Sequence, residues 1–278
     1  MDKMKAMNCP YRVLYRNPDI EFQPYPYFRS KDGCKDMYVV SPQHGRSFLM
    51  GKQGDSYIIS KGNGLSYTSY SVLNTDDFSD HLWGVLFRDA AIRDFRIGME
   101  VAKMGVHTNR MCCVIELQYD IKKDDNIIRP CLLQYMVDSP YRLSDFPYMT
   151  KAQVEQAVAN WVGEEECRNK KKHIIAANVL VRNLYILHSN HVLHNAIHLQ
   201  NYTWALELLD FELSRTDSFP YCDQEDEIIV GKLYKREVMQ TYEIIYNIAA
   251  FLNEKICFNE IENIFDNYGF ALNNFKIL

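Results

Sequence analysis

The sequence contains no run of about 18 consecutive apolar residues, the length from which a membrane-spanning helix is predicted. Its first residues, MDKMKAMNCPYR, are mixed and polar, unlike the charged-then-apolar pattern of a secretory signal. Its eight cysteines include no CxxC pair and follow no regular disulfide framework. We therefore expect free thiols, a reducing compartment, a cytoplasmic location and no membrane partner.

A large excess of basic residues is also missing. The net charge of −5 and the pI near 5.9 argue against a general nucleic-acid binder. The longest basic run, RNKKKH from Arg168 to His173, is followed at once by an apolar helical pattern. We interpret this run as the solvated start of a helix, with an anionic partner as the alternative. With 47% hydrophobic residues, the chain can still bury a full core.

The first part of the chain alternates short apolar runs with Gly, Pro and Asn turns, which is typical of β-strands. The strands expected there are Met37–Val40, Ser47–Met50, Tyr57–Ser60, Met111–Leu117 and Cys131–Met136. One stretch, from about Phe78 to Met104, has helical periodicity instead, and Gly105 is placed to end that helix.

The second part of the chain is helical in pattern. The helices expected there run from about Thr150 to Val162, Asn169 to His188, Lys232 to Asn253 and Phe258 to Asn267. We predict an α+β fold with two lobes, as in protein kinases. Residues 1–120 form a β-rich N-terminal lobe with one long helix, and residues 121–278 form a mainly helical C-terminal lobe. Such lobes favour a nucleotide in the cleft between them.

The most specific chemistry lies in His188–Glu212, HSNHVLHNAIHLQNYTWALELLDFE. Kinase catalytic loops read H-R-D-x-x-x-x-N and are followed by a hairpin and a D-F-G motif. His188, Asn190 and Asn195 have the spacing of the His, Asp and Asn, and Asp210 follows the second strand of an expected hairpin, Ala196–Leu199 and Leu206–Leu209. An amide oxygen and a carboxylate suit Mg²⁺, so Asn195 and Asp210 are the predicted metal ligands.

Two other interpretations of this segment are open. It could be an ordinary hairpin after a helix, with a chance Asp-Phe pair. Alternatively, the histidines at positions 188, 191, 194 and 198 could bind zinc, although no cysteine and no H-E-x-x-H pattern accompanies them.

A kinase-like site also needs a strand lysine held by an acidic residue on a helix. Lys61 closes an expected strand, and Asp94 and Glu100 lie on the long helix that follows. A glycine-bearing stretch that includes Gly45 and Arg46, followed by Gly51-Lys52-Gln53-Gly54, resembles a hairpin over phosphates. Taken alone, a lysine such as Lys61 is more often an exposed residue at the end of a strand, and only its combination with the catalytic-loop segment favours a role in the site.

These residues together resemble the selenoprotein O family. The segment KGNGLSYTS from Lys61 is similar to the family's L-K-G-x-G-x-T-x-(Y/F)-S motif. Asp89 to Arg110 aligns without a gap on the family's next helix and turn, and His188 to Gln200 aligns on its H-G-V-x-N-T-D-N-M-S-I-L-G loop. Within Asp89 to Arg110, the residues identical to the family pattern are Ile92, Arg93, Phe95, Gly105, Thr108 and Arg110, and Asp94 replaces a Glu.

The resemblance implies a kinase-fold enzyme that binds ATP and Mg²⁺ and transfers AMP to Ser, Thr or Tyr hydroxyls of a protein substrate. It implies that Lys61 and Asp94 form the lysine–acid pair and that Arg46, beside Gly45, contacts phosphate from the hairpin. It also implies that Asn195 and Asp210 bind the metal, and Arg142 occupies a later arginine position of the family.

The sequence also departs from the family at the catalytic positions. His194 replaces the aspartate that is the family's proposed base, and Asn190 stands where kinases have their catalytic Asp. An imidazole can act as a base near neutral pH, so His194 is a candidate base. Gln134 takes the place of a second phosphate-binding arginine.

The leading functional hypothesis is therefore protein AMPylation. The alternatives are a catalytically impaired pseudokinase, which senses nucleotide or acts as a scaffold, and a kinase-like phosphotransferase.

Overall fold

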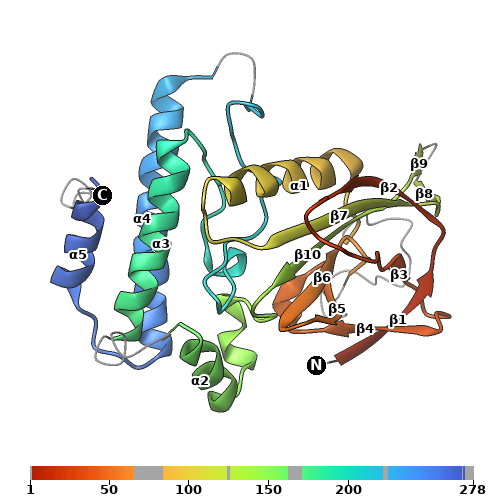
Figure 1. Ribbon diagram of the computed structural model, residues 1–278, viewed down its shortest axis with the longest axis horizontal. Helices are drawn as coiled ribbons and strands as arrows, with labels where there is room; N and C mark the ends of the chain where they lie inside the picture. Colours follow the sequence, from red (N-terminus) through yellow and green to blue (C-terminus); the bar gives the residue numbers. More distant parts are fainter. Residues whose placement is uncertain are drawn as a thin grey trace. The chain divides into compact units, whose positions relative to one another are not determined.

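A computed structural model describes residues 2–65, 84–123, 126–161, 171–221, 225–270 and 272 of the chain. The chain is a mixed α/β protein with a large antiparallel sheet and several helices (Figure 1). It divides into two compact units. Unit 1 contains residues 1–99 and 109–141, and unit 2 contains residues 100–108 and 142–278.

Unit 1 is built on one eight-stranded sheet in the order β2-β7-β10-β6-β5-β4-β1-β3, in which every pairing is antiparallel. Its strands are β1 (Asp2–Asn8), β2 (Tyr11–Arg16), β3 (Tyr27–Arg29), β4 (Lys35–Val39), β5 (Ser47–Gln53), β6 (Ser56–Lys61), β7 (Arg110–Leu117) and β10 (Cys131–Val137). The strands β7 and β10 lie inside the sheet, and all of their residues except Arg110 are buried, as suits strands covered on both faces.

The strands expected from the sequence are present as β4, β5, β6, β7 and β10. The three N-terminal strands were not predicted, because their residues are mixed and polar and β1 and β2 leave many side chains exposed. Pairing of β10 with both β6 and β7 carries unit 1 to Tyr141, beyond the boundary expected after residue 120. Between β7 and β10, the chain forms a small hairpin of β8 (Ile121–Lys123) and β9 (Asn126–Ile128).

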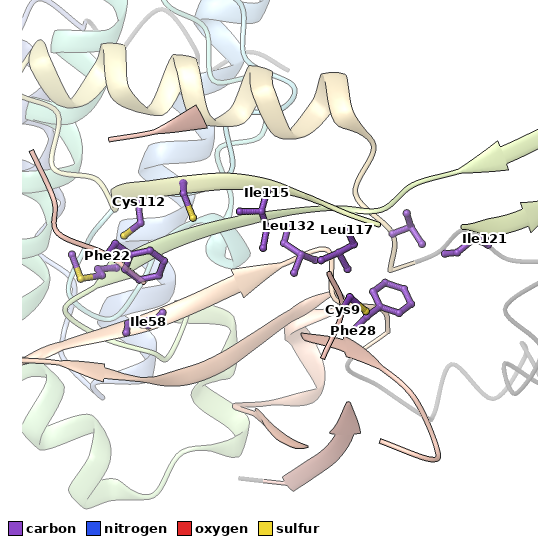
Figure 2. Close-up of a cluster of buried hydrophobic side chains, with 12 residues drawn as sticks. Cys9, Phe22, Phe28, Ile58, Cys112, Ile115, Leu117, Ile121 and Leu132 are labelled. Carbon is purple, nitrogen blue, oxygen red and sulfur yellow. The ribbon is translucent and has the colours of Figure 1, made fainter. Parts of the chain in front are cut away.

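The two faces of the sheet are covered by different parts of the chain. Helix α1 (Arg88–Lys103) packs on one face, where a Cβ on Gly98 would lie 2.2 Å from the Met111 side chain of β7. The other face is covered by the N-terminal segment, whose Phe22 and Phe28 join a buried cluster with Ile58 and Leu132 (Figure 2). These layers bury the central strands on both faces, and Lys61 at the end of β6 is buried as well.

Helix α1 begins ten residues later than the helix expected from about Phe78. Val85 and Leu86 form bridges with Asn63 and Cys131 instead, so their backbone groups are paired with the sheet. The expected helical residues 78–83 lie outside the described part of the chain. Gly105 adopts φ 91 shortly after the helix, as the sequence predicts for a helix stop.

Unit 2 is helical. Its helices are α2 (Lys151–Ala159), α3 (Lys172–Ser189), α4 (Glu227–Phe251) and α5 (Phe258–Asn267), and α3 packs against α4 and α5 (Figure 1). Helix α2 begins with a capping box, in which the side chains of Thr150 and Gln153 each bond the other residue's backbone N–H. Helix α4 begins five residues earlier than expected, because Asp226 caps the N–H groups of Ile228 and Ile229.

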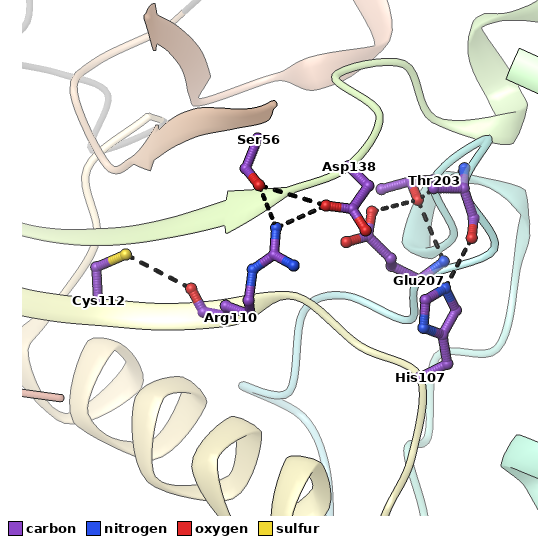
Figure 3. Close-up of polar contacts among 8 residues, drawn as sticks. Ser56, His107, Arg110, Cys112, Asp138, Thr203 and Glu207 are labelled. Atoms are coloured by element: carbon purple, nitrogen blue, oxygen red, sulfur yellow. Dashed lines mark hydrogen bonds and ion pairs between the residues drawn. The ribbon is translucent and has the colours of Figure 1, made fainter. Parts of the chain in front are cut away.

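The hairpin expected after the catalytic-loop motif is not a pair of strands. In its place are a short 3₁₀ helix, η4 (Leu199–Asn201), and isolated bridges that join Leu208 to Tyr202 and Thr108. Side chains hold this irregular backbone: Thr203 Oγ1 donates to Glu207 at 2.8 Å, and the His107 ring bonds the Ala205 carbonyl at 2.8 Å (Figure 3). In this segment, polar side-chain contacts therefore determine the backbone conformation more than the strand propensity of its apolar residues does.

No helix in the described ranges has both the length and the apolarity needed to cross a membrane. The described cysteines, Cys9, Cys34, Cys112, Cys113, Cys131 and Cys257, are all free, as expected. Cys167 and Cys222, the basic residues 168–170 and the motif residues 66–69 lie outside the described ranges.

Candidate functional site

Lys61 and Asp94 form a buried ion pair within unit 1. Lys61 ends β6, and its Nζ donates to Oδ2 of Asp94 on α1 at 2.8 Å. The two residues are only 3% and 1% exposed, so neither charge is solvated by bulk water. The strand ends here because Gly62 adopts φ 102, and a Cβ at this position would lie 2.4 Å from the Cys131 carbonyl oxygen. The pair joins a strand to a helix 33 residues later.

Gly45 and Arg46 lie at the same end of the sheet as Lys61. Gly45 has φ 58 and follows a short 3₁₀ helix, Pro42–His44, that joins β4 to β5. The carbonyl of Arg46 accepts from the N–H of Gly62 at 2.9 Å, and its guanidinium donates to the Val85 carbonyl at 3.2 Å. The second glycine stretch, Gly51–Gly54, lies at the opposite end of β5, since Gln53 pairs with Ser56. The two stretches do not form one hairpin.

Gln134 points away from Lys61. Its partner across the β6–β10 pair is Ser60, so both face one side of the sheet while Lys61 and Leu133 face the other. The Gln134 amide donates to Ser60 Oγ at 3.0 Å and exchanges hydrogen bonds with the backbone of Tyr25. An arginine here would not reach the Lys61 side, so Gln134 does not mark the loss of a phosphate contact there.

In unit 2, the catalytic-loop segment is anchored by a buried glutamate. Glu237 of α4 is fully buried, and its two carboxylate oxygens accept from His188 Nε2 at 2.9 Å and from the Asn195 N–H at 2.5 Å. The ring of His188 also lies edge-on to Tyr234 and Phe270. One carboxylate therefore fixes both ends of the loop that connects His188 to Asn195.

The side chain of Asn195 contacts the guanidinium of an arginine on α4. Arg236 of α4 donates to both the side-chain oxygen and the backbone carbonyl of Asn195. Asn195 has φ 66, and Asp210 has φ 68, a conformation that few residues other than Gly, Asn and Asp adopt readily. The backbone thus holds both predicted metal ligands in unusual conformations.

Asp210 has a second carboxylate beside it. The side chains of Asp210 and Glu212 are half-buried, and their oxygens can lie within 4.8 Å of each other. Carboxylate oxygens at this separation suit a hard divalent cation such as Mg²⁺. Phe211 between them is fully buried against the His194 ring, at 5.2 Å between centroids, which anchors the segment.

The proposed base, His194, is fully buried and uses both ring nitrogens. Nε2 lies 2.8 Å from the carbonyl of Leu209, and Nδ1 accepts from the Ala196 N–H at 3.3 Å. A ring with these partners is neutral and carries its proton on Nε2. Asn190 caps the end of α3 and donates its amide to the Ile186 carbonyl at 2.8 Å.

Arg142 lies at the start of the 3₁₀ helix η2 (Leu143–Tyr148), where its N–H donates to Asp145 at 2.6 Å. It is 8% exposed and forms a bridge with Thr203. Burial lowers the pKa of His198, and the positive charge of Arg142 lowers it further, while the carboxylate of Asp210 opposes the shift. Arg142 thus places a positive charge in the same unit as Asp210 and His198.

The zinc alternative is not supported by the contacts of the histidines. His188 bonds Glu237 and His194 bonds backbone groups. Among the described residues, no metal-ligating group is formed from these histidines.

Comparisons with known proteins give no family assignment. No family model matches the chain, and no curated protein matches it in sequence. Among solved structures, the chain is similar to a Stt7 homolog from Micromonas algae soaked with ATP. The TM-score is 0.40 at 12% identity, and the match covers 90% of this chain and 84% of that one.

Several residues around the candidate ligands could not be identified from the sequence. Glu237 and Arg236 are 42 and 41 residues from Asn195, with no motif that connects them to it. Glu212 could have been noticed, because it takes the position of the glycine in a D-F-G motif. Helical periodicity alone would have hinted at Glu237, a charged residue within the apolar stripe of α4.

Proposed function

We propose that the chain binds ATP with Mg²⁺ and transfers AMP to Ser, Thr or Tyr hydroxyls of proteins, as the selenoprotein O family does. The observation that carries the proposal is the buried Lys61–Asp94 pair. A buried ion pair is weak support for stability, because the cost of desolvating two charges offsets their attraction. A functional need for a fixed ammonium accounts for its presence better.

The order of parts along unit 1 also supports nucleotide binding. In protein kinases a glycine-bearing loop covers the phosphates, a strand lysine contacts them, and a helix acid orients that lysine. Here the loop with Gly45 and Arg46 precedes the strand that ends in Lys61, and helix α1 then supplies Asp94. In this proposal Lys61 donates to phosphate oxygens, and Asp94 keeps its ammonium aimed.

For the metal, the donor set in unit 2 fits Mg²⁺. Asp210 and Glu212 offer carboxylate oxygens and Asn195 offers an amide oxygen, which are the hard ligands that Mg²⁺ takes. Bound Mg²⁺ would neutralise charge on the phosphates during transfer. Asn195 and Asp210 would hold it, and Glu237 would keep Asn195 in position through its backbone.

A second candidate function is nucleotide binding without transfer, as in a pseudokinase. The contacts of His194 favour it, because a base must reach the hydroxyl proton and both nitrogens of this ring already face backbone groups. Asn190 cannot replace it, since an amide is not a base and this one bonds its own helix. The Lys61–Asp94 pair serves either function.

The test is to incubate the protein with Mg²⁺, a mixed protein substrate and ATP labelled on the α- or the γ-phosphate. Covalent α-label supports AMP transfer, and γ-label without α-label supports a phosphotransferase. ATP binding without either label supports the pseudokinase. No label and no binding by calorimetry would rule out all of these functions.

In the same assay Asp210→Ala should abolish Mg²⁺-dependent ATP binding, or transfer if transfer occurs. Asp266→Ala, an exposed carboxylate on α5, is the matched control and should behave as the wild type. Equal Mg²⁺ dependence in Asp210→Ala and the wild type would show that Asp210 is not a metal ligand.

A further inference from the structure

Unit 2 contains a cavity that the proposed nucleotide chemistry does not use. Its volume is about 380 Å³, which lies within the range of small-molecule and side-chain pockets. One wall is helix α4, and the other is the segment Ile197–Gln200 with Ser144 of η2. All of these elements belong to unit 2.

The lining of the cavity has an apolar part and an oxygen-rich part. Ile197, Leu199 and Ile244 supply aliphatic side chains. Gln240, Glu243 and Asn247 recur at the three- and four-residue spacing that places side chains on one face of a helix. The pocket therefore offers both a surface for methylene groups and a row of acceptors.

Two polar atoms at this cavity have unmet hydrogen-bonding capacity. Gln240 Oε1 and Ser144 Oγ are buried and have no hydrogen-bond partner. A buried acceptor without a partner costs free energy that a bound donor recovers. A ligand that brings several N–H groups would satisfy such a site.

The charge of the lining also selects the ligand. Among the lining residues that the structure describes, Glu243 is the acidic side chain, and none is a lysine or an arginine. Burial lowers the pKa of His198, which favours its neutral imidazole. The charge of the described lining therefore favours a cation over a phosphate or a nucleotide as the occupant.

We propose that this pocket binds an arginine or lysine side chain of the protein that the chain modifies, an inference that rests on the proposed function. The aliphatic stem would lie on Ile197 and Leu199, and the cationic head would donate to Glu243 and Gln240. The pocket wall begins two residues after Asn195, so the same loop would hold the metal ligand and read the substrate.

The test compares N-acetyl-arginine amide with N-acetyl-citrulline amide, which has nearly the same shape and no charge. Saturation-transfer NMR on the full chain gives the two dissociation constants. We expect the arginine compound to bind at least about fivefold more tightly, as for a partly exposed charge-assisted contact. Equal binding of the two compounds, or no saturable binding, would overturn the inference.

The matched variants are Glu243→Gln and Glu227→Gln. Both residues are exposed on α4, but only Glu243 lines the cavity. Glu243→Gln should remove the preference for arginine, and Glu227→Gln should keep it; the same preference in both would contradict the inference. ATP binding is measured separately on the wild type. If the wild type prefers the arginine compound but does not bind ATP, the proposed function is wrong and this inference stands. If it binds ATP but shows no preference for the arginine compound, only this inference is wrong.

Discussion

The side-chain oxygen of Asn195 contacts the guanidinium of Arg236, and the proposed function assigns the same oxygen to Mg²⁺. An amide oxygen bonded to a guanidinium is a poorer metal ligand, because the metal must first displace the arginine. If Asn195 binds Mg²⁺ as proposed, Arg236 competes with the metal for this oxygen.

Replacing Arg236 with Met should strengthen Mg²⁺-dependent ATP binding. We expect the Mg²⁺ concentration at half-saturation, measured by calorimetry at fixed ATP, to fall about fivefold, which corresponds to one modest hydrogen bond to a charged group. The matched control is Arg182→Met on the exposed face of α3, which should leave the midpoint unchanged. An unchanged or higher midpoint in Arg236→Met would remove Asn195 from the metal site.

Residue types and spacing identified candidates, but not their partners. Lys61 and Asp94 were named from the sequence, and the structure brings them to 2.8 Å, while their role in binding nucleotide stays a prediction. The contacts of Arg236 and Glu237 with Asn195 were missed because they depend on tertiary packing, which no motif around Asn195 reveals. His194 was named for its chemistry, yet its burial was not visible in the motif.

At the scale of elements, helix α3 has an N-terminus that its own sequence does not cap. Its first turn contains no acidic residue, and its N-cap is Lys171 without a side-chain cap. Glu254, from the segment between α4 and α5, accepts from the N–H groups of Lys172 and His173 at 2.9 and 3.0 Å and from the His173 ring at 2.6 Å. A distant carboxylate thus performs the capping.

This capping predicts a pH-dependent effect of Glu254→Gln. Burial raises the pKa of Glu254, but hydrogen bonds from His173 and Lys172 outweigh it, and the net pKa lies below 4.5. The carboxylate therefore stabilises the fold above about pH 4.5, and this stability is lost as pH falls through the folded-state pKa. Urea unfolding should show a loss of about 1–2 kcal/mol at pH 7 in the variant.

The difference between wild type and Glu254→Gln should shrink as the pH falls below about 4.5 and through the lowered folded-state pKa, because the protonated carboxyl then resembles the amide. Asp266→Asn on exposed α5 is the control and should change the free energy of unfolding by no more than about 0.5 kcal/mol over the same pH range. A difference that stays constant with pH would show that charge does not contribute to this cap.

Elements were predictable where periodicity was strong. Helices α2 to α5 and strands β4 to β7 and β10 all follow apolar patterns of the expected period. The segment 196–209 was not, because its apolar residues suggested strands while Thr203, Glu207 and His107 bond its backbone into another shape. Polar contacts across the chain outweighed a short local pattern.

At the scale of the whole molecule, the labelling rate of the buried cysteines measures how often unit 1 opens and how far a bound ligand slows that opening. Cys112 (Figure 2) and its neighbour Cys113 belong to the buried core cluster of the sheet, and burial raises the pKa of each thiol to about 12. Thiols in this state react with maleimides or disulfides only after the sheet opens. Cys34 is exposed and serves as an internal control.

Because Lys61 belongs to the same sheet, ATP that binds unit 1 should slow labelling of Cys112 and Cys113. At Mg·ATP concentrations about 100 times the dissociation constant, ligand linkage adds about 2.7 kcal/mol, so the rate should fall about 100-fold when labelling requires unfolding. Mass spectrometry of labelled peptides measures each cysteine, and Cys34 should react at the same rate with and without ATP.

The double variant Lys61→Met with Asp94→Leu distinguishes a role of the ion pair in binding ATP from a role in the stability of the fold. It removes both charges together, so no unpaired charge stays buried, and stability should change less than in Asp94→Asn alone. ATP should no longer protect the core thiols in the double variant. If ATP protected them to the same degree as in the wild type, Lys61 would not contact the nucleotide, and the buried pair would be a structural feature of the sheet alone.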